Sequence, residues 1–170
     1  DEFVQFILAG QPEPPLYFAR MKRDNRRGPA LMPTLPQPVP LDTAGIALLA
    51  GRTDVVVLDT RTRGAFFAGH VPGSILAELD FQFGSIAGSY VEEGTPVYLV
   101  VEAARLDDAV RACVRVGLDR VVGYVTTDVL DDYARRGGQL RQTQVIDMAQ
   151  MEAERRAGRG VVVDVRGVGE

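Results

Sequence analysis

Short apolar segments alternate with helical patterns from residue 43 to residue 136, and this alternation limits the possible folds more than any other feature of the chain. Apolar residues at every third or fourth position predict helices, and short apolar runs between turn residues predict buried strands. The predicted helices cover residues 43–50, 62–68, 81–88, 106–116 and 127–136, and the predicted strands cover residues 54–59, 74–78, 96–101 and 120–125. This order favours an α/β fold in which helices cover both faces of a parallel sheet.

The first 40 residues differ in composition from the rest of the chain. Residues 1–9 place apolar side chains at helical spacing before a glycine and a proline, which predicts the last helix of a preceding unit. Residues 11–40 hold eight of the ten prolines and a basic run, which predicts a linker with one short helix around residues 16–26. Tyr17 and Phe18 favour docking of this segment against a neighbouring domain, since two adjacent aromatic rings would otherwise lie in water. A solvated basic linker is the plainer interpretation.

Charge and cysteine content exclude several classes of function. A net charge of −4 offers no basic surface for nucleic acid or anionic lipid, so neither is expected as a partner. No apolar run approaches the ~20 residues that a membrane span needs, and the opening residues lack a secretory signal, so a cytoplasmic location is expected. With a single cysteine, Cys113, and a single histidine, His70, we expect no internal disulfide and no metal or other cofactor in this chain.

Two segments of the chain are similar to each other at an offset of 105 residues. Aligned without a gap, residues 41–65 and 146–170 each place a helical pattern before Val-Val-x-Asp-x-Arg. The identical pairs are Asp42 and Asp147, Ala44 and Ala149, Val56 and Val161, Val57 and Val162, Asp59 and Asp164, Arg61 and Arg166, and Gly64 and Gly169. Duplication of one segment explains this match better than does a helix-strand pattern that unrelated segments could share. We therefore expect residues 141–170 to open a second unit with a helix and a strand, residues 160–165, whose apolar face needs a surface to cover it.

Residues 59–74 carry a motif that resembles a known family. Asp59-Thr60-Arg61, then Phe66-Phe67, then Gly69-His70-Val71-Pro72-Gly73-Ser74 closely resemble the pattern of rhodanese-like domains. The resemblance covers residues 34–140 and restarts at residue 141. It implies an α/β domain with a five-stranded parallel sheet and helices on both faces, followed by the start of a second rhodanese-like unit.

The residues of this motif are expected to have structural roles. Asp59 and Arg61 end a buried strand, where a paired carboxylate and guanidinium could lock the turn, and Asp164 and Arg166 repeat this pair. Gly69, Pro72 and Gly73 supply turn geometry before the next strand. For His70 we expect a hydrogen-bonded structural histidine rather than an acid or base, because no nucleophile accompanies it nearby in sequence.

The loop after the strand 96–101 departs from the pattern of active rhodanese-like domains. The resemblance implies a reactive cysteine there, in a loop whose backbone N–H groups hold an anionic sulfur. This chain instead has Val101-Glu102-Ala103-Ala104-Arg105, so we expect no catalytic residue in the loop. Glu102, Asp107 and Asp108 also bring negative charge to the helix start, where an anionic substrate would bind. The loop lacks the glycine and terminal arginine of the related dual-specificity phosphatase loop as well.

Cys113 is not expected to replace the missing cysteine. Leu106, Val110, Cys113, Val114 and Gly117 follow the spacing of the apolar stripe of an amphipathic helix. A thiol buried in apolar surroundings keeps a high pKa and is inert. We therefore predict that Cys113 is a core residue.

The N-terminal segment, residues 1–33, resembles the exit from a metallo-β-lactamase-fold domain in bacterial proteins that fuse such a domain to one or two rhodanese units. With no methionine at its start, the chain is expected to be a piece of such a protein. The resemblance implies an upstream domain, with iron or zinc, that acts as a hydrolase or a persulfide dioxygenase. The expected partners are that domain and the second rhodanese-like unit, and homodimer formation is left open. In this hypothesis the chain is a non-catalytic module, and the second unit could carry the reactive cysteine.

A second hypothesis makes the chain an enzyme in its own right. Carboxylates such as Glu102 and Asp107 follow the strand 96–101, and α/β sheets bind ligands beyond the carboxyl ends of their strands. A hydrolase or transferase using these two residues is the alternative function.

Overall fold

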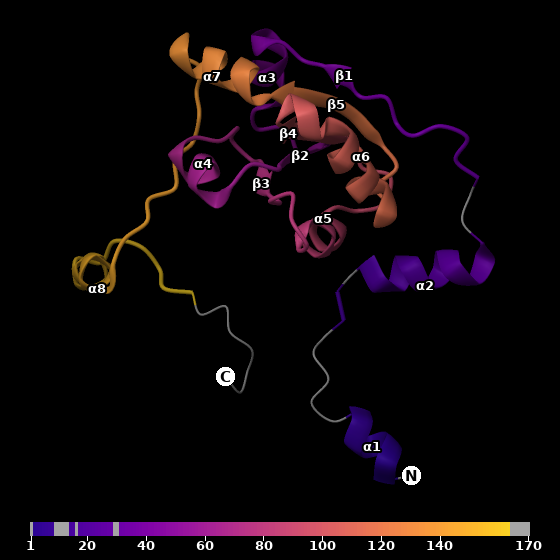
Figure 1. Cartoon of the computed structure of the whole chain (residues 1–170). Helices are drawn as coiled ribbons and strands as arrows, with labels where there is room; N and C mark the ends of the chain where they lie inside the picture. Colours follow the sequence, from indigo (N-terminus) through magenta and orange to yellow (C-terminus); the bar gives the residue numbers. More distant parts are fainter. Residues whose placement is uncertain (1, 9–13, 16, 29–30, 164–170) are drawn as a thin grey trace.

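The computed structural model describes residues 2–8, 14–15, 17–28 and 31–163 (Figure 1). Five parallel strands form one sheet in the order β1-β5-β4-β2-β3. The strands are β1 (Val39–Pro40), β2 (Val56–Asp59), β3 (Ile75–Leu76), β4 (Val97–Val101) and β5 (Val121–Thr126). The α/β architecture that the alternation predicts is therefore confirmed, with β2 and β4 in the interior of the sheet.

Four helices connect successive strands in the described part of the chain: α3 (Thr43–Leu49), α4 (Arg63–Ala68), α5 (Phe83–Tyr90) and α6 (Leu106–Arg115), with a short 3-10 helix, η1 (Ala103–Arg105), before α6. Helices α1 (Glu2–Leu8) and α2 (Tyr17–Arg27) precede β1, and α7 (Thr127–Arg135) and α8 (Met148–Arg156) follow β5. Every helix and strand predicted between residues 43 and 136 is present within three residues of its predicted bounds. The pattern did not predict β1, because two residues that include a proline are too short to show a period.

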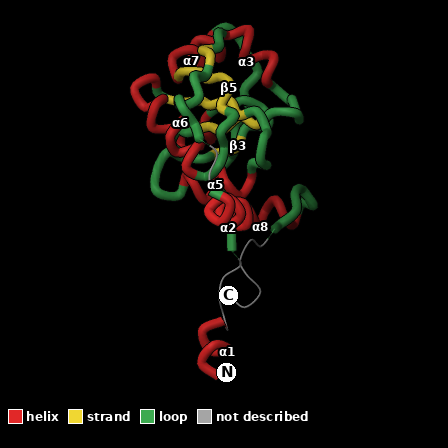
Figure 2. The backbone as a smooth tube through the Cα atoms, turned by 90° about the vertical axis from the view of Figure 1, so that its right-hand side faces the viewer, coloured by secondary structure: helices red, strands yellow, loops and turns green. Residues whose placement is uncertain are grey.

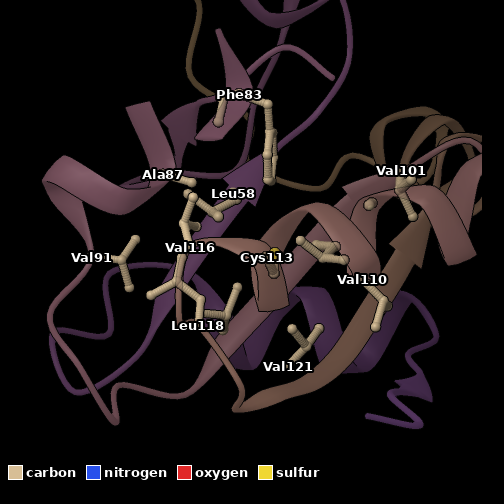
Figure 3. Close-up of a cluster of buried hydrophobic side chains, with 14 residues drawn as sticks. Leu58, Phe83, Ala87, Val91, Val101, Val110, Cys113, Val116, Leu118 and Val121 are labelled. Carbon is tan, nitrogen blue, oxygen red and sulfur yellow. The ribbon is translucent and has the colours of Figure 1, made fainter. Parts of the chain in front are cut away.

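Two apolar clusters, one on each face of the sheet, make up the core. Side chains alternate between the faces along a strand, so Leu58 and Leu99 belong to one cluster while Val57 and Val100 belong to the other. The first cluster lies under α5 and α6, and Figure 3 shows its buried side chains around Cys113. The second lies under α3 and α7. In both views of the backbone the strands separate α3 and α7 from α5, as expected for a sheet with helices on both faces (Figures 1 and 2).

Glycine is required at one point where β4 and β5 pair. A Cβ atom at Gly123 would lie 2.7 Å from the ring of Tyr98 and 3.2 Å from the carbonyl oxygen of Val39. The register between the two strands shifts at Val97 and Tyr98. The absent side chain therefore lets the tyrosine ring and the β1 backbone approach β5 from its two neighbouring strands.

Helix α2 docks on the end of the domain where α5 and α6 finish. The ring of Tyr17 lies over Gly88 of α5, where a Cβ atom would be 2.7 Å from the ring. Arg20 is buried, and its Nη2 donates a hydrogen bond of 2.5 Å to the carbonyl oxygen of Val116, at the C-terminus of α6. A cation there interacts favourably with the helix dipole. The neighbour against which Tyr17 docks is thus the α/β unit of this same chain.

The end of the described chain lies apart from the sheet. Asp147 caps α8 by accepting a hydrogen bond from the Gln150 N–H, and Gln150 returns one from its side chain, as in a capping box. No residue of α8, from Met148 to Arg156, is buried. The predicted strand 160–165 is not formed in its described part, residues 160–163, where the three valines are between 63% and 88% exposed. Residues 164–165 lie outside the described residues.

Candidate functional site

The carboxyl ends of three neighbouring strands meet at a shallow depression of about 350 Å³. It is lined by Arg61, Thr62 and Ala65 after β2, by Glu102 after β4, and by Thr127 and Asp131 after β5. The loops after the adjacent strands β2 and β4 lead into α4 and α6, so this edge is where an open α/β sheet places its ligand site. Sequence reasoning missed Thr127 and Asp131. Thr127 follows β5 directly, but Asp131 lies inside α7, and only the pairing of β5 with β4 brings these residues to the depression.

The Asp59 carboxylate and the Arg61 guanidinium form an ion pair at this edge. Nη2 of Arg61 lies 2.7 Å from one Asp59 oxygen, and Nε lies 2.9 Å from the other. The Asp59 side chain is fully buried, and that of Arg61 is 11% exposed. Arg61 also donates a hydrogen bond of 2.7 Å to the carbonyl oxygen of Gly69. Because both charged groups are engaged inside the protein, the pair ties the end of β2 to the turn after α4.

His70 lies in a buried environment next to α4. Its Nδ1 is 2.9 Å from the carbonyl oxygen of Phe66, and its ring stacks on the Phe66 ring with centroids 3.9 Å apart. The backbone of His70 also exchanges two hydrogen bonds with Arg141. The ring is thus held by local contacts, and His70 does not line the depression at the carboxyl edge.

The glycines and the proline of the motif shape the turn between α4 and β3. Gly73 has a φ of +86°, a left-handed conformation that favours glycine. Pro72 accepts a hydrogen bond from the Gly51 N–H through its carbonyl oxygen. Gly69 ends α4, and its own backbone is extended. Of the predicted motif residues, Asp164 and Arg166 lie outside the described residues.

The loop after β4 carries no cysteine. Val101 is fully buried as the last residue of β4, while Glu102, Ala103, Ala104 and Arg105 are exposed. Nη2 of Arg105 donates a hydrogen bond of 2.9 Å to the carbonyl oxygen of Leu79, which fixes the loop to the segment before α5. Asp107 and Asp108 occupy the first turn of α6, as predicted. The structure brings Glu102 to the depression, but Asp107 does not line it.

Cys113 belongs to the core, as predicted. Its side chain is fully buried in the cluster under α5 and α6 (Figure 3). Burial raises the pKa of the thiol to about 12, because the thiolate would lose its hydration. A neutral, enclosed thiol cannot act as a nucleophile at the carboxyl edge of the sheet.

No three His, Cys, Asp or Glu side chains in the described part of the chain lie close enough together to hold a metal ion. None of the described helices is both long and apolar enough to cross a bilayer.

Comparisons with known proteins place this architecture among solved structures. No protein-family model matches the chain, and no curated protein matches it. A metallo-beta-lactamase from Staphylococcus aureus aligns at 26% identity with a TM-score of 0.61, over 74% of this chain and 34% of that one. The Alr3790 protein from Anabaena sp. aligns at 19% identity with a TM-score of 0.50, over 67% of this chain and 99% of that one.

Another structure from the same Anabaena protein is described as its rhodanese-like domain, and it aligns at 17% identity with a TM-score of 0.49, over 79% of this chain and 98% of that one. The fold is that of the Alr3790 structure aligned at a TM-score of 0.50, a protein whose domains are described as rhodanese-like. The five-stranded parallel sheet agrees with the α/β architecture that the Asp-x-Arg and Gly-His-Val-Pro-Gly motifs imply. The chain spans only about a third of the length of the staphylococcal protein.

Proposed function

We propose that this chain is a non-catalytic rhodanese-like module of a sulfur-metabolism enzyme. In this proposal an upstream metallo-β-lactamase-fold domain oxidises or hydrolyses a thiol-derived substrate, either a persulfide or a thioester. A second rhodanese-like unit, opened by residues 141–170, would follow the module. The metal, iron or zinc, belongs to the upstream domain and not to this chain.

One observation carries the non-catalytic part of the proposal. Sulfur transfer needs a thiolate at the carboxyl edge, and the loop after β4 instead presents exposed Glu102 beside buried Val101. The depression at that edge is lined by the carboxylates of Glu102 and Asp131, whereas its one arginine, Arg61, is already paired with Asp59. An anionic sulfur donor would therefore meet repulsion there rather than stabilisation.

The proposal of an upstream domain rests on a different observation. The staphylococcal metallo-beta-lactamase is similar to this chain over a third of its own length, which leaves about two thirds of that protein unmatched. Residues 1–33 resemble the exit from a metallo-β-lactamase-fold domain. Such a domain in the unmatched part would agree with that resemblance. This supports a protein in which a hydrolytic or oxidative metal domain and a rhodanese-like module share one chain.

Sulfurtransferase assays test the non-catalytic role. The chain is incubated with thiosulfate or a persulfide as donor and with cyanide or a thiol as acceptor. Turnover equal to that of a protein-free blank is expected, because no activated thiolate is present. Turnover that survives Cys113→Ser would contradict the proposal, since it would require a nucleophile other than the sole cysteine.

The mass and metal content of the natural protein from which the chain comes test the proposal of an upstream metal domain. Both are measured on the same intact sample. A mass well above 18.5 kDa with bound iron or zinc is expected. A metal-free protein of about the mass of this chain would overturn the upstream domain and leave the carboxylate hydrolase as the stronger hypothesis.

The alternative enzyme is tested with a single substitution. Glu102 is the only member of the predicted Glu102 and Asp107 pair that lines the depression. If the chain hydrolyses model esters or thioesters, Glu102→Gln is expected to remove that activity while Asp107→Asn retains it. An activity that is indifferent to Glu102→Gln would exclude this site as its source.

A further inference from the structure

An arginine-lined groove runs along one side of α6, away from the depression already described. Its lining residues are Leu79, Asp80, Arg105, Asp108, Arg111, Ala112 and Arg115, and its volume is about 360 Å³. Positions 108, 111, 112 and 115 recur at helical spacing and therefore share one face of α6. The segment 79–80, which leads toward α5, faces them across the groove.

The arginines of this groove differ from most other arginines of the chain in having no acidic partner. Arg111 and Arg115 make no hydrogen bond or ion pair with any described residue, and Arg105 makes only its bond to the Leu79 carbonyl oxygen. Eight arginines elsewhere are paired with carboxylates in the described part of the chain: Arg23, Arg52, Arg61, Arg135, Arg136, Arg155, Arg156 and Arg159. In a chain of net charge −4, three guanidinium groups against the two carboxylates of the groove leave this surface with a net positive charge.

The two acidic residues of the groove offset part of this positive charge but form no ion pair with the three arginines. Asp80 is engaged locally, because its Oδ1 accepts a hydrogen bond of 2.8 Å from the Gln82 N–H. Asp108 lies in the first turn of α6, where a carboxylate interacts with the helix dipole. No ion pair links either aspartate to Arg105, Arg111 or Arg115 among the described residues.

We propose that this groove binds a small polyanion, of the diphosphate class, through Arg105, Arg111 and Arg115. Guanidinium groups remain charged at neutral pH and bind phosphate oxygens in a bidentate manner, so two arginines one helical turn apart suit two adjacent phosphates. A single anionic group would contact fewer of the arginines. Its attraction to them would then not offset the repulsion from the carboxylates of Asp80 and Asp108. The site is independent of the proposed function, since binding needs no chemistry at the carboxyl edge.

The position of the groove determines where the other end of a bound molecule would lie. Arg105 belongs to the loop after β4, so one end of the groove opens at the same edge of the sheet as the depression. A molecule held by its diphosphate along α6 would thus present its other end near that loop. The module could then hold an anionic carrier molecule without transforming it.

Calorimetric titration of the chain with inorganic pyrophosphate at low ionic strength tests the site. Binding with a dissociation constant below about 1 mM is expected. Arg111→Gln with Arg115→Gln should weaken it at least about tenfold, as expected on loss of two charge-assisted contacts. Both side chains are exposed, so the melting temperature of this variant should match that of the natural chain.

A matched control uses the two arginines of α7. Arg135→Gln with Arg136→Gln removes the same total charge from a face where both arginines already contact Asp132. This control should bind pyrophosphate as the natural chain does. An equal loss in the control, or no binding by the natural chain, would overturn the proposal. Tighter binding of a hexaglutamate peptide than of pyrophosphate would also overturn it, because that result would assign the groove to an acidic protein partner.

Discussion

The two copies of the proposed internal repeat, residues 41–65 and 146–170, have similar sequences, but their described parts adopt different structures. In residues 41–65, Asp42 caps α3 and the following valines enter β2, between two other strands. In residues 146–163, Asp147 caps α8 in the same way, but the following valines are exposed and form no strand. A helix cap is satisfied by residues three positions apart, whereas a strand needs partners from distant parts of the chain. The repeat therefore shows which part of the pattern folds locally and which part depends on a sheet.

The largest expected difference between the copies is in thiol accessibility. In a Val162→Cys variant, the new thiol should react with a maleimide at the rate of an exposed cysteine, while Cys113 of the same molecule reacts only on unfolding. The two rates should differ by at least about a thousandfold, as set by the stability of a folded domain. Peptide mass spectrometry after timed labelling measures both rates in one sample. Similar rates at the two sites would show that the residues around Cys113 open readily.

Removal of the buried carboxylate of the first copy should give the next largest effect. Asp59→Ala leaves the guanidinium of Arg61 with little exposure and no countercharge, which is expected to cost about 3 to 5 kcal/mol of unfolding free energy. Urea denaturation followed by circular dichroism measures this loss.

The surface pair Arg52 and Asp54 supplies the control for that substitution. Both side chains are largely exposed, so Asp54→Ala should change the unfolding free energy by less than about 1 kcal/mol. Losses of equal size from the two substitutions would mean that burial does not set the strength of the Asp59 and Arg61 pair.

A matched pair of valines compares the two copies directly. Val57 is 5% exposed in β2, and the aligned Val162 is 63% exposed. Val57→Ala should lower the unfolding free energy by about 2 kcal/mol, because it removes two buried methyl groups and leaves a cavity. Val162→Ala should change it by less than about 0.5 kcal/mol. An equally large loss for Val162→Ala would show that the second copy packs on a surface in solution.

The two helix caps should give the smallest effects. Asp42→Ala removes the acceptor for the Gly45 N–H and is expected to cost about 1 kcal/mol of global stability. Asp147→Ala removes the acceptor for the Gln150 N–H but should leave the global unfolding midpoint unchanged, since α8 buries none of its residues, Met148 to Arg156. It should instead reduce the helical signal of the native protein. A shift of the global unfolding midpoint in Asp147→Ala would show that α8 unfolds cooperatively with the core.

The sequence predicted well those features that local patterns encode. The helices and strands from α3 to α7, the burial of Cys113 and the absence of a thiol from the loop after β4 could all be read from spacing and motif. The predicted strand 160–165 is not formed in its described part, residues 160–163, because apolar content alone cannot supply a pairing partner. The lining of the depression by Thr127 and Asp131 could not be predicted either, since it depends on β5 lying beside β4.

The contact between Arg20 and the end of α6 also bears on the order in which the molecule folds. The two partners, Arg20 and Val116, lie 96 residues apart in sequence, and the acceptor takes its position at the end of α6 only once α6 has formed. Contacts of such long separation are slow to form, because the intervening chain must first be closed into a loop. We therefore expect helix α2 to dock late, on a sheet that has already folded. By the same argument it can detach while the sheet stays intact, so its amide protons should exchange with solvent well before those of β2 and β4.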